Sequence, residues 1–317
     1  MKETAFAKIN LALHVRGRRE DGYHELETLF AFVDAGDVLV GTSAERDGLT
    51  TLGEFAGALN QPPSPAGRGR GRGSEAEPSV PAGVEHPHPD PPPQGGGGKE
   101  LGPAREGGGG LFGNLVAKAL HALPRPEGLH ITLEKNLPVA AGLGGGSADA
   151  GAVFRLVRER YGLPEDWQAR AAKLGADVPA CVESVTCIGR GTGTELEPAD
   201  DSLSGTPVLL VNPRVPLSTG PVFKDWDGED RGPLPQGDAR TIAREGRNDL
   251  EAPAIRLCPP IADILAILRE TDAFLARMCG SGATCFALYD SEQARDAASA
   301  KVTARRPDWW QMKGRLR

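Results

Sequence analysis

The hydrophobic and polar positions near the start of the chain predict a β-ribbon. Two mostly apolar segments, residues 5–15 and 29–33, flank a turn at 17–22 that is rich in Gly, Arg and Asp. The polar stretch at 34–37 should interrupt the second arm, and a short strand should follow at 38–40. Apolar runs bounded by such turn residues are typical of paired strands. We therefore expect strands rather than helices in the first forty residues.

Further along the chain, helical periodicity and strand alternation mix without a regular order. Apolar residues at helical spacing predict helices over 115–123, 147–161, 165–174, 261–270 and 291–305. Alternating or uniformly apolar runs predict strands near 129–135, 185–188, 207–212 and 285–289. Because no regular strand–helix–strand repeat appears, the α+β class is favoured over a doubly wound parallel sheet.

The composition changes sharply between residues 61 and 112. This segment holds 11 of the 27 prolines and 14 of the 42 glycines, with few hydrophobic residues. Such a segment cannot bury enough apolar surface to offset the entropy lost on ordering, so a disordered insertion is predicted. Its five basic and six acidic residues nearly cancel, and three arginines among glycines are a weak signal for RNA binding. We expect an inert surface loop.

Charge and cysteine content narrow the class of protein further. A net charge of −7 argues against a generally basic nucleic-acid binder. The chain has no apolar run of about 18 residues, and its N-terminus lacks the apolar core of a signal peptide. Five cysteines form no CxxC pair and have no nearby histidine, so we expect reduced, mostly buried thiols and no zinc site. The expectation is a cytoplasmic protein without nucleic-acid or membrane partners.

The strongest chemical signal is the run PVAAGLGGGSADA at residues 138–150, which follows a predicted strand and opens a predicted helix. Clustered glycines let backbone N–H groups approach an anion, and a helix N-terminus adds unpaired donors and a positive dipole end. The spacing matches neither a Walker A loop nor a dinucleotide-binding fingerprint. From these residues alone, a phosphate loop and a tight turn are equally supported.

Three motifs in order resemble the GHMP kinase superfamily. They are Ala7-Lys8-Ile9-Asn10-Leu11, the run at 138–150, and the late loop Met278-Cys279-Gly280-Ser281-Gly282-Ala283-Thr284-Cys285-Phe286. The resemblance implies a two-domain α+β GHMP kinase fold, with an ATP-binding domain at 1–158 and a C-terminal domain at 159–317. It also implies an ATP site formed by Pro138, Ala140, Ala141, Gly142, Leu143, Gly144, Gly145, Gly146 and Ser147. The loop at 280–284 is expected to be structural rather than a direct ligand contact.

Within the superfamily, the chain resembles the kinases that phosphorylate cytidine-diphospho-methylerythritol in non-mevalonate isoprenoid biosynthesis. The resemblance covers nearly the whole chain except 61–112. Its motifs are AKINLALHVRGRREDGYHELETLF at 7–30, Gly175-Ala176-Asp177-Val178-Pro179 and Asn248-Asp249-Leu250-Glu251. It implies transfer of the ATP γ-phosphate to the C2 hydroxyl of that substrate.

The same resemblance assigns individual roles. Asp177 is implied as the catalytic base and Lys8 as the group that keeps it ionised and stabilises the transferring phosphoryl group. The implied substrate-binding residues are Asn10 near the methylerythritol, Tyr23, His24 and Phe223 around the cytosine, and Thr192 and Thr219 beside them. Gly220 departs from the more usual proline, which leaves the shape of that loop open.

Some questions remain open from the sequence. Mg²⁺ is expected with ATP, but no carboxylate ligand can be named, since Asp149 could instead face the exterior of its helix. A homoserine- or mevalonate-type kinase is the alternative enzyme, and a non-catalytic ligand-binding relative is the alternative of another class. The oligomeric state is not predicted.

Overall fold

Two long antiparallel strands, β1 (Lys2–Arg18) and β2 (His24–Ala44), form the central element of the fold. The structure is a computed structural model that describes residues 1–57 and 114–317. The insertion predicted at 61–112 lies outside the described residues. The β-ribbon is confirmed, but the expected interruption at 34–37 is wrong, because β2 runs through it without a break. Asp37 is buried there beside charged and backbone partners, so this polar position belongs to the interior and not to a turn.

The first sheet is built around β2. It has six strands in the order β3–β4–β2–β5–β6, with β1 paired to β2. The added strands are β3 (Gly48–Leu52), β4 (Gly128–Glu134), β5 (Cys187–Gly191) and β6 (Glu195–Pro198). One half of β2 pairs with β5 and the other half pairs with β4. A single long strand therefore connects all parts of this sheet.

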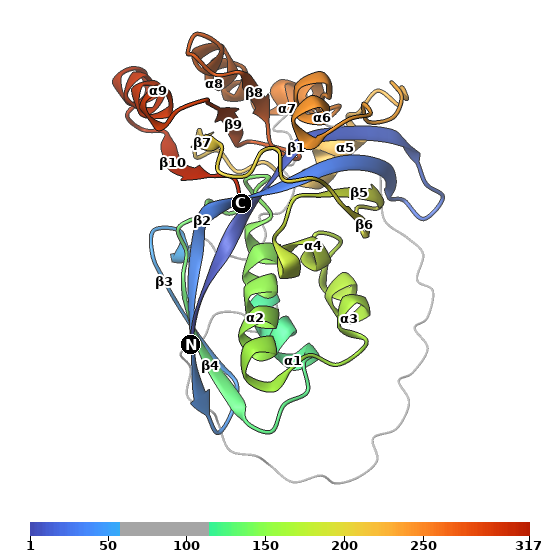
Figure 1. The fold of residues 1–317 in the computed structure, drawn as a ribbon, viewed down its shortest axis with the longest axis vertical. Helices are drawn as coiled ribbons and strands as arrows, with labels where there is room; N and C mark the ends of the chain where they lie inside the picture. Colours follow the sequence, from blue (N-terminus) through green and yellow to red (C-terminus); the bar gives the residue numbers. More distant parts are fainter. Residues whose placement is uncertain (58–113) are drawn as a thin grey trace, which may run out of the picture. The chain divides into compact units, whose positions relative to one another are not determined.

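Four helices lie together beside the β1–β2 ribbon (Figure 1), and their apolar side chains form one core with it. They are α1 (Leu115–Ala122), α2 (Gly145–Tyr161), α3 (Trp167–Leu174) and α4 (Val178–Glu183). The contact between α2 and α4 is very close, because a Cβ added to Gly151 would lie 2.5 Å from the Cys181 carbonyl oxygen. Only glycine permits this approach, which sets the position of α4.

The second sheet is formed by the C-terminal part of the chain. Its antiparallel strands follow the order β10–β7–β9–β8, and α8 and α9 lie with them (Figure 1). The strands are β7 (Pro207–Asn212), β8 (Leu275–Met278), β9 (Cys285–Leu288) and β10 (Trp310–Arg315). The helices are α5 (Thr219–Lys224), α6 (Ala239–Glu245), α7 (Glu251–Leu257), α8 (Pro260–Arg269) and α9 (Glu292–Arg305).

The α+β class is confirmed, and so are the longer predicted elements. The helices predicted at 115–123 and 291–305 begin after side-chain caps at Asn114 and Ser291, and β7 has the predicted bounds. The two sheets divide between Pro198 and Pro207, while the domain boundary expected near residue 158 stays a prediction. All five cysteines are buried and free of disulfides. In the part of the chain that the structure describes, no helix is long and apolar enough to span a membrane.

We expect Gly151→Ala to lower the free energy of unfolding by about 1–3 kcal/mol, the usual cost of overpacking. The added methyl group overlaps the Cys181 carbonyl, so α2 and α4 must move apart. Gly17→Ala is the matched control, because a Cβ at Gly17 would meet no atom within 4 Å. Urea unfolding of both variants checks this. Equal stability of the two proteins would contradict the close contact.

Candidate active site

A cavity of about 920 Å³ opens between the glycine-rich loop, β1 and α5. Nearly all of the residues predicted for the site line it together. These are Lys8, Asn10, Tyr23, His24, Pro138, Ala140, Ala141, Gly142, Gly144, Gly145, Gly146, Ser147, Asp177, Thr192, Thr219 and Phe223. Leu143 is the exception: its side chain is buried in the core, and its carbonyl accepts from the Lys8 amide at 3.2 Å. Leu143 therefore does not line the cavity, and its assignment to the ATP site stays a prediction.

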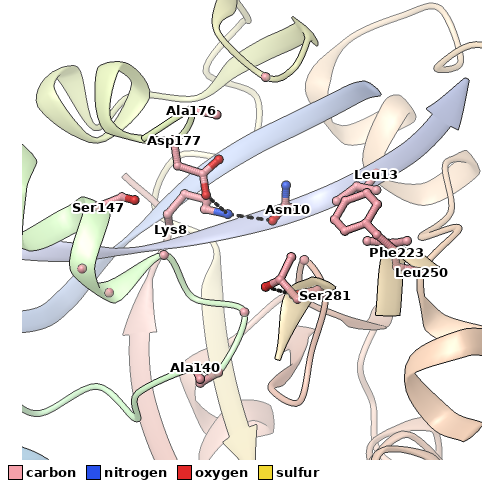
Figure 2. A pocket seen from close by; sticks show the side chains of 18 of the residues that line it. Lys8, Asn10, Leu13, Ala140, Ser147, Ala176, Asp177, Phe223, Leu250 and Ser281 are labelled. Carbon is pink, nitrogen blue, oxygen red and sulfur yellow. Dashed lines mark hydrogen bonds and ion pairs between the residues drawn. The ribbon is translucent and has the colours of Figure 1, made fainter. Parts of the chain in front are cut away.

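The Lys8 ammonium lies at the centre of the cavity (Figure 2). Its Nζ is 3.0 Å from Asp177 Oδ2 and donates to Asn10 Oδ1 at 3.0 Å. Asn10 in turn donates to the Thr28 hydroxyl at 2.8 Å. Lys8 is only 4% exposed. Burial is the largest influence and lowers the pKa of Lys8, but Asp177 and then the neighbouring Cys279 and Cys181 together raise it by more. The pKa is therefore raised overall, and the ammonium stays charged.

Asp177 owes its orientation to the start of α4. It immediately precedes this helix, and Pro179 fits the first turn, where the missing N–H costs nothing. Its side chain makes no capping hydrogen bond to the helix and instead points to Lys8 (Figure 2). About a third of the side chain is exposed to the cavity. The carboxylate is thus held by one cation and still open to a ligand.

The glycine-rich loop runs from β4 to α2 and packs tightly on both sides. Gly144 has φ +61°, and a Cβ there would lie 2.9 Å from Lys8 Cε. Gly142 has φ +78°, and a Cβ there would lie 2.4 Å from the Cys279 carbonyl oxygen. No side chain caps α2 at Gly144, so the first-turn N–H groups depend on a ligand or water for partners. This arrangement suits a bound anion.

A second buried ion cluster lies behind this loop. Lys135 Nζ is 2.5 Å from Asp37 Oδ2 and 2.9 Å from Asp149 Oδ2, and all three residues are almost fully buried. Asp37 also accepts from the Asn136 and Leu137 amides at 2.6 and 2.8 Å, where the loop begins. The question left open for Asp149 is answered, because it faces inward and not the helix exterior.

The charge on Asp149 is unfavourable in this cluster. Burial raises the pKa of Asp149 to about 8, Lys135 opposes the shift, and the neighbouring Asp37 adds to it. Among residues 1–57 and 114–317, Asp149 Oδ1 has no hydrogen-bond partner. Lys135 therefore faces two carboxyl groups, and the raised pKa of Asp149 favours its protonated form.

Aromatic side chains form the opposite end of the cavity. The rings of His24 and Phe223 lie 4.8 Å apart at 38°, and Tyr23 beside them is 65% exposed. Burial, and then the nearby Arg18 cation, lower the pKa of His24, so its imidazole is neutral. The buried Nε2 of His24 has no partner among the described residues. A planar ligand with a polar edge would satisfy both the rings and this nitrogen.

Threonine and serine hydroxyls line the wall between the two ends. Thr219 Oγ1 lies 2.9 Å from Ser281 Oγ, and Thr192 is in the turn between β5 and β6. Gly280 and Ser281 of the late loop line the cavity directly, although the sequence favoured a structural role for this loop.

Sequence reasoning missed several other lining residues. The cavity also contacts Leu13, Arg18, Lys135 and Leu250. Leu13 and Leu250 carry no local chemical signal. Lys135 ends the strand predicted at 129–135, where an ordinary surface lysine could also stand, so only its tertiary partners distinguish it.

The fold and this cavity define a GHMP kinase. The models of the GHMP kinases N terminal domain and of the GHMP kinases C terminal match residues 114–185 and 233–308. The chain is 55% identical to the 4-diphosphocytidyl-2-C-methyl-D-erythritol kinase of Erythrobacter litoralis (strain HTCC2594), over 99% of this chain and 98% of the relative. The kinase of the same name from Novosphingobium aromaticivorans is 57% identical, over 100% of this chain and 93% of the relative. The chain therefore belongs to the 4-diphosphocytidyl-2-C-methyl-D-erythritol kinase family.

Solved structures agree with this family. A crystal structure of 4-(cytidine 5'-diphospho)-2C-methyl-D-erythritol kinase has a TM-score of 0.71 and 31% identity, and the match covers 100% of this chain and 99% of that chain. Homoserine kinase from Cytophaga hutchinsonii has a TM-score of 0.58 at 15% identity, over 99% and 95% of the two chains. This second likeness shows the fold alone.

We expect Asp149→Asn to gain stability relative to the natural chain as the pH rises. The pKa of Asp149 is about 8 in the folded state against an ordinary value of 3.8. Protonated Asp149 therefore contributes to the free energy of unfolding; this contribution is fully present below pH 3.8 and is lost as the pH rises through 8. Asparagine has no such proton to lose. Urea unfolding at pH 5.5 and 7.5 should show the difference between variant and natural chain growing by about 1–3 kcal/mol. A difference that stays constant with pH would contradict the raised pKa.

Proposed function

We propose that this protein transfers the γ-phosphoryl group of ATP to the C2 hydroxyl of 4-diphosphocytidyl-2-C-methyl-D-erythritol, in non-mevalonate isoprenoid precursor biosynthesis. The observation that carries the proposal is the position of the Lys8–Asp177 pair. Figure 2 shows it with Ser147 of the glycine-rich loop on one side and Phe223, Leu13 and Leu250 on the other. A phosphate-binding end and a base-binding end thus meet at one ion pair.

The two charged residues divide the chemistry between them. Asp177 accepts the proton of the C2 hydroxyl while the oxygen bonds to the γ-phosphorus and the bond to ADP breaks. Lys8 orients the Asp177 carboxylate through their 3.0 Å contact and stabilises negative charge on the phosphoryl oxygens during the transfer. Its position in the middle of β1, tied to Asn10, holds the ammonium in place. No covalent enzyme intermediate is required.

Backbone groups and one hydroxyl are assigned to the nucleotide. The residues from Pro138 to Ser147 that line the cavity receive the ATP phosphates, with the N–H groups of the first turn of α2 as donors. Mg²⁺ neutralises the charge of the β- and γ-phosphates when it is bound. Ser147 is a suitable ligand for it, because its hydroxyl lines the cavity at this turn. The described residues contain no group of three or more acidic, His or Cys side chains for a metal, which fits an ion held mainly by phosphates and water.

The aromatic end is assigned to the cytosine. Tyr23 and Phe223 offer ring faces for stacking, and the neutral His24 offers its unpaired Nε2 to the polar edge of the base. Thr192 and Thr219 are assigned further polar contacts with the substrate. Asn10 is assigned to the methylerythritol, which its hydrogen bond to Lys8 supports. Homoserine and mevalonate have no base for this pocket, which favours the cytidine-linked substrate over them.

A substrate panel tests the proposal. Purified protein with Mg-ATP should release ADP with 4-diphosphocytidyl-2-C-methyl-D-erythritol and only at background rate with homoserine or mevalonate. Transfer to one of these smaller alcohols would replace the proposed substrate. ATP turnover with none of them would favour a non-catalytic ligand-binding protein.

We expect Asp177→Asn to lower kcat at least about 100-fold, the usual contribution of a general base. Steady-state ADP release measures it. Asp166→Asn is the matched control, because Asp166 also precedes a helix without capping it and pairs with a cation, Arg170, at the surface. A variant with near-normal kcat would show that Asp177 is not the base.

We expect Tyr23→Ala to raise KM for the cytidine substrate about 5- to 100-fold, since stacking on a base is worth about 1–3 kcal/mol. KM for ATP should stay unchanged, and Tyr23→Phe should retain most of the affinity because the ring remains. A large loss of kcat with KM unchanged would contradict the stacking role.

A further inference from the structure

The polar residues of the motif Asn248-Asp249-Leu250-Glu251 have no role in the mechanism above, yet their side chains all make hydrogen bonds. The motif connects α6 to α7 and will be called the 248–251 segment. Asn248 is only 8% exposed. Its Nδ2 donates to the Met278 and Gly280 carbonyl oxygens, both at 2.8 Å, and its Oδ1 accepts from the Leu250 amide at 3.0 Å. Both protons of the Asn248 side-chain amide are therefore hydrogen-bonded to the start of the loop at 278–286.

That loop forms part of the cavity wall. Gly280 and Ser281 line the cavity, and Ser281 Oγ lies 2.9 Å from Thr219 Oγ1. A Cβ added to Gly280 would lie 2.9 Å from the Gly142 carbonyl oxygen and 3.2 Å from Asn10 Oδ1. The loop thus fills the space between Gly142 of the glycine-rich loop, Asn10 and Thr219. A small displacement of Gly280 would therefore shift its contacts with all three.

The segment is anchored to β1 at the same time. The Asp249 amide donates to the Leu13 carbonyl at 2.9 Å, and Asp249 Oδ2 accepts from the Val15 amide at 2.8 Å. Leu13 and Leu250 both line the cavity near Phe223 (Figure 2). The 248–251 segment therefore connects the strand that carries Lys8 and Asn10, through Asp249, to the loop that contacts Gly142 and Thr219, through Asn248.

We propose that Asn248 is a positioning residue for phosphoryl transfer. By holding the Gly280 carbonyl, its amide fixes the wall that aligns the acceptor alcohol with the phosphate end. This inference rests on the proposed function, because it requires that both substrates meet at the Lys8–Asp177 pair. Asn248 lines no part of this cavity, so it acts through Gly280, Ser281 and Thr219 and touches neither substrate. The geometry matters because transfer requires the acceptor oxygen in line with the γ-phosphorus.

We expect Asn248→Ala to raise KM for the cytidine substrate about tenfold and to lower kcat about tenfold, with KM for ATP within about twofold. A misaligned acceptor also lets water take the phosphoryl group, giving ADP and inorganic phosphate. The ratio of ADP formed to alcohol phosphorylated should therefore rise severalfold. This ratio does not depend on how much of the enzyme is folded, so a loss of stability alone would not move it.

Asn212→Ala is the matched control. Asn212 is also a buried asparagine, and its Nδ2 donates to the Thr284 side chain at the far end of the same loop, at 2.9 Å. We expect it to lose stability while keeping both KM values and the ADP ratio. Asn248→Asp, which has the same size but cannot donate to both carbonyls, is the second variant and should reproduce the kinetic defect.

The outcomes separate the two proposals. An active natural chain whose Asn248 variants keep normal KM and ADP ratio would overturn the positioning role alone. Failure of both Asn248 variants to fold would also overturn the positioning role, because Asn248 would then be required for the stability of the fold. A natural chain that does not phosphorylate the cytidine substrate would overturn the proposed function and the role of Asn248 with it.

Discussion

The burial of the Lys8 ammonium is the constraint on which the rest of the site depends. A cation that is 4% exposed is tolerated only with a close anionic or hydrogen-bonding partner. Asp177 and Asn10 fill this need at 3.0 Å each. Asp177 can reach Lys8 only because α4 lies where the Gly151 contact puts it, and the glycine-rich loop can pass over Lys8 only because Gly144 has no side chain. Two glycines of one helix, Gly144 at its N-cap and Gly151 within it, thus serve one ion pair.

The long strand β1 carries several of the residues that line the cavity. Lys8 and Asn10 are two residues apart, so their side chains share one face of the strand, as the period of a β-strand requires. Irregularities in its pairing with β2 occur between Phe6 and Lys8 and between Asn10 and Ala12. Such bulges re-aim side chains without ending the strand. Leu13, which lines the apolar end of the cavity, therefore lies on the same strand as Lys8 and Asn10. The strand fixes the distance between them.

Sequence patterns predicted the parts of this protein that depend on local interactions. The longer helices, β7 and the glycine-rich turn all follow from periodicity, caps and backbone freedom within a few residues. Long-range pairing explains what was missed. Asp37 looked like a turn residue because its partner, Lys135, is 98 positions away, and β2 runs through it. The contact of Asn248 with Gly280 is likewise invisible before the fold brings the two segments together.

The pairing of charges also bears on the proposed role of the glycine-rich loop in phosphate binding. Lys8 is held by Asp177, and Lys135 is held by Asp37 and Asp149. At this end of the cavity both lysines among the described residues therefore meet carboxyl groups before any nucleotide arrives. If the loop holds the ATP phosphates as proposed, most of the attraction must come from its oriented N–H groups. The bends at Gly142 and Gly144, where a side chain would not fit, set the direction of these groups. A glycine-rich turn at a helix N-terminus supplies such donors without adding charge, and leaves Lys8 available for the transferring group.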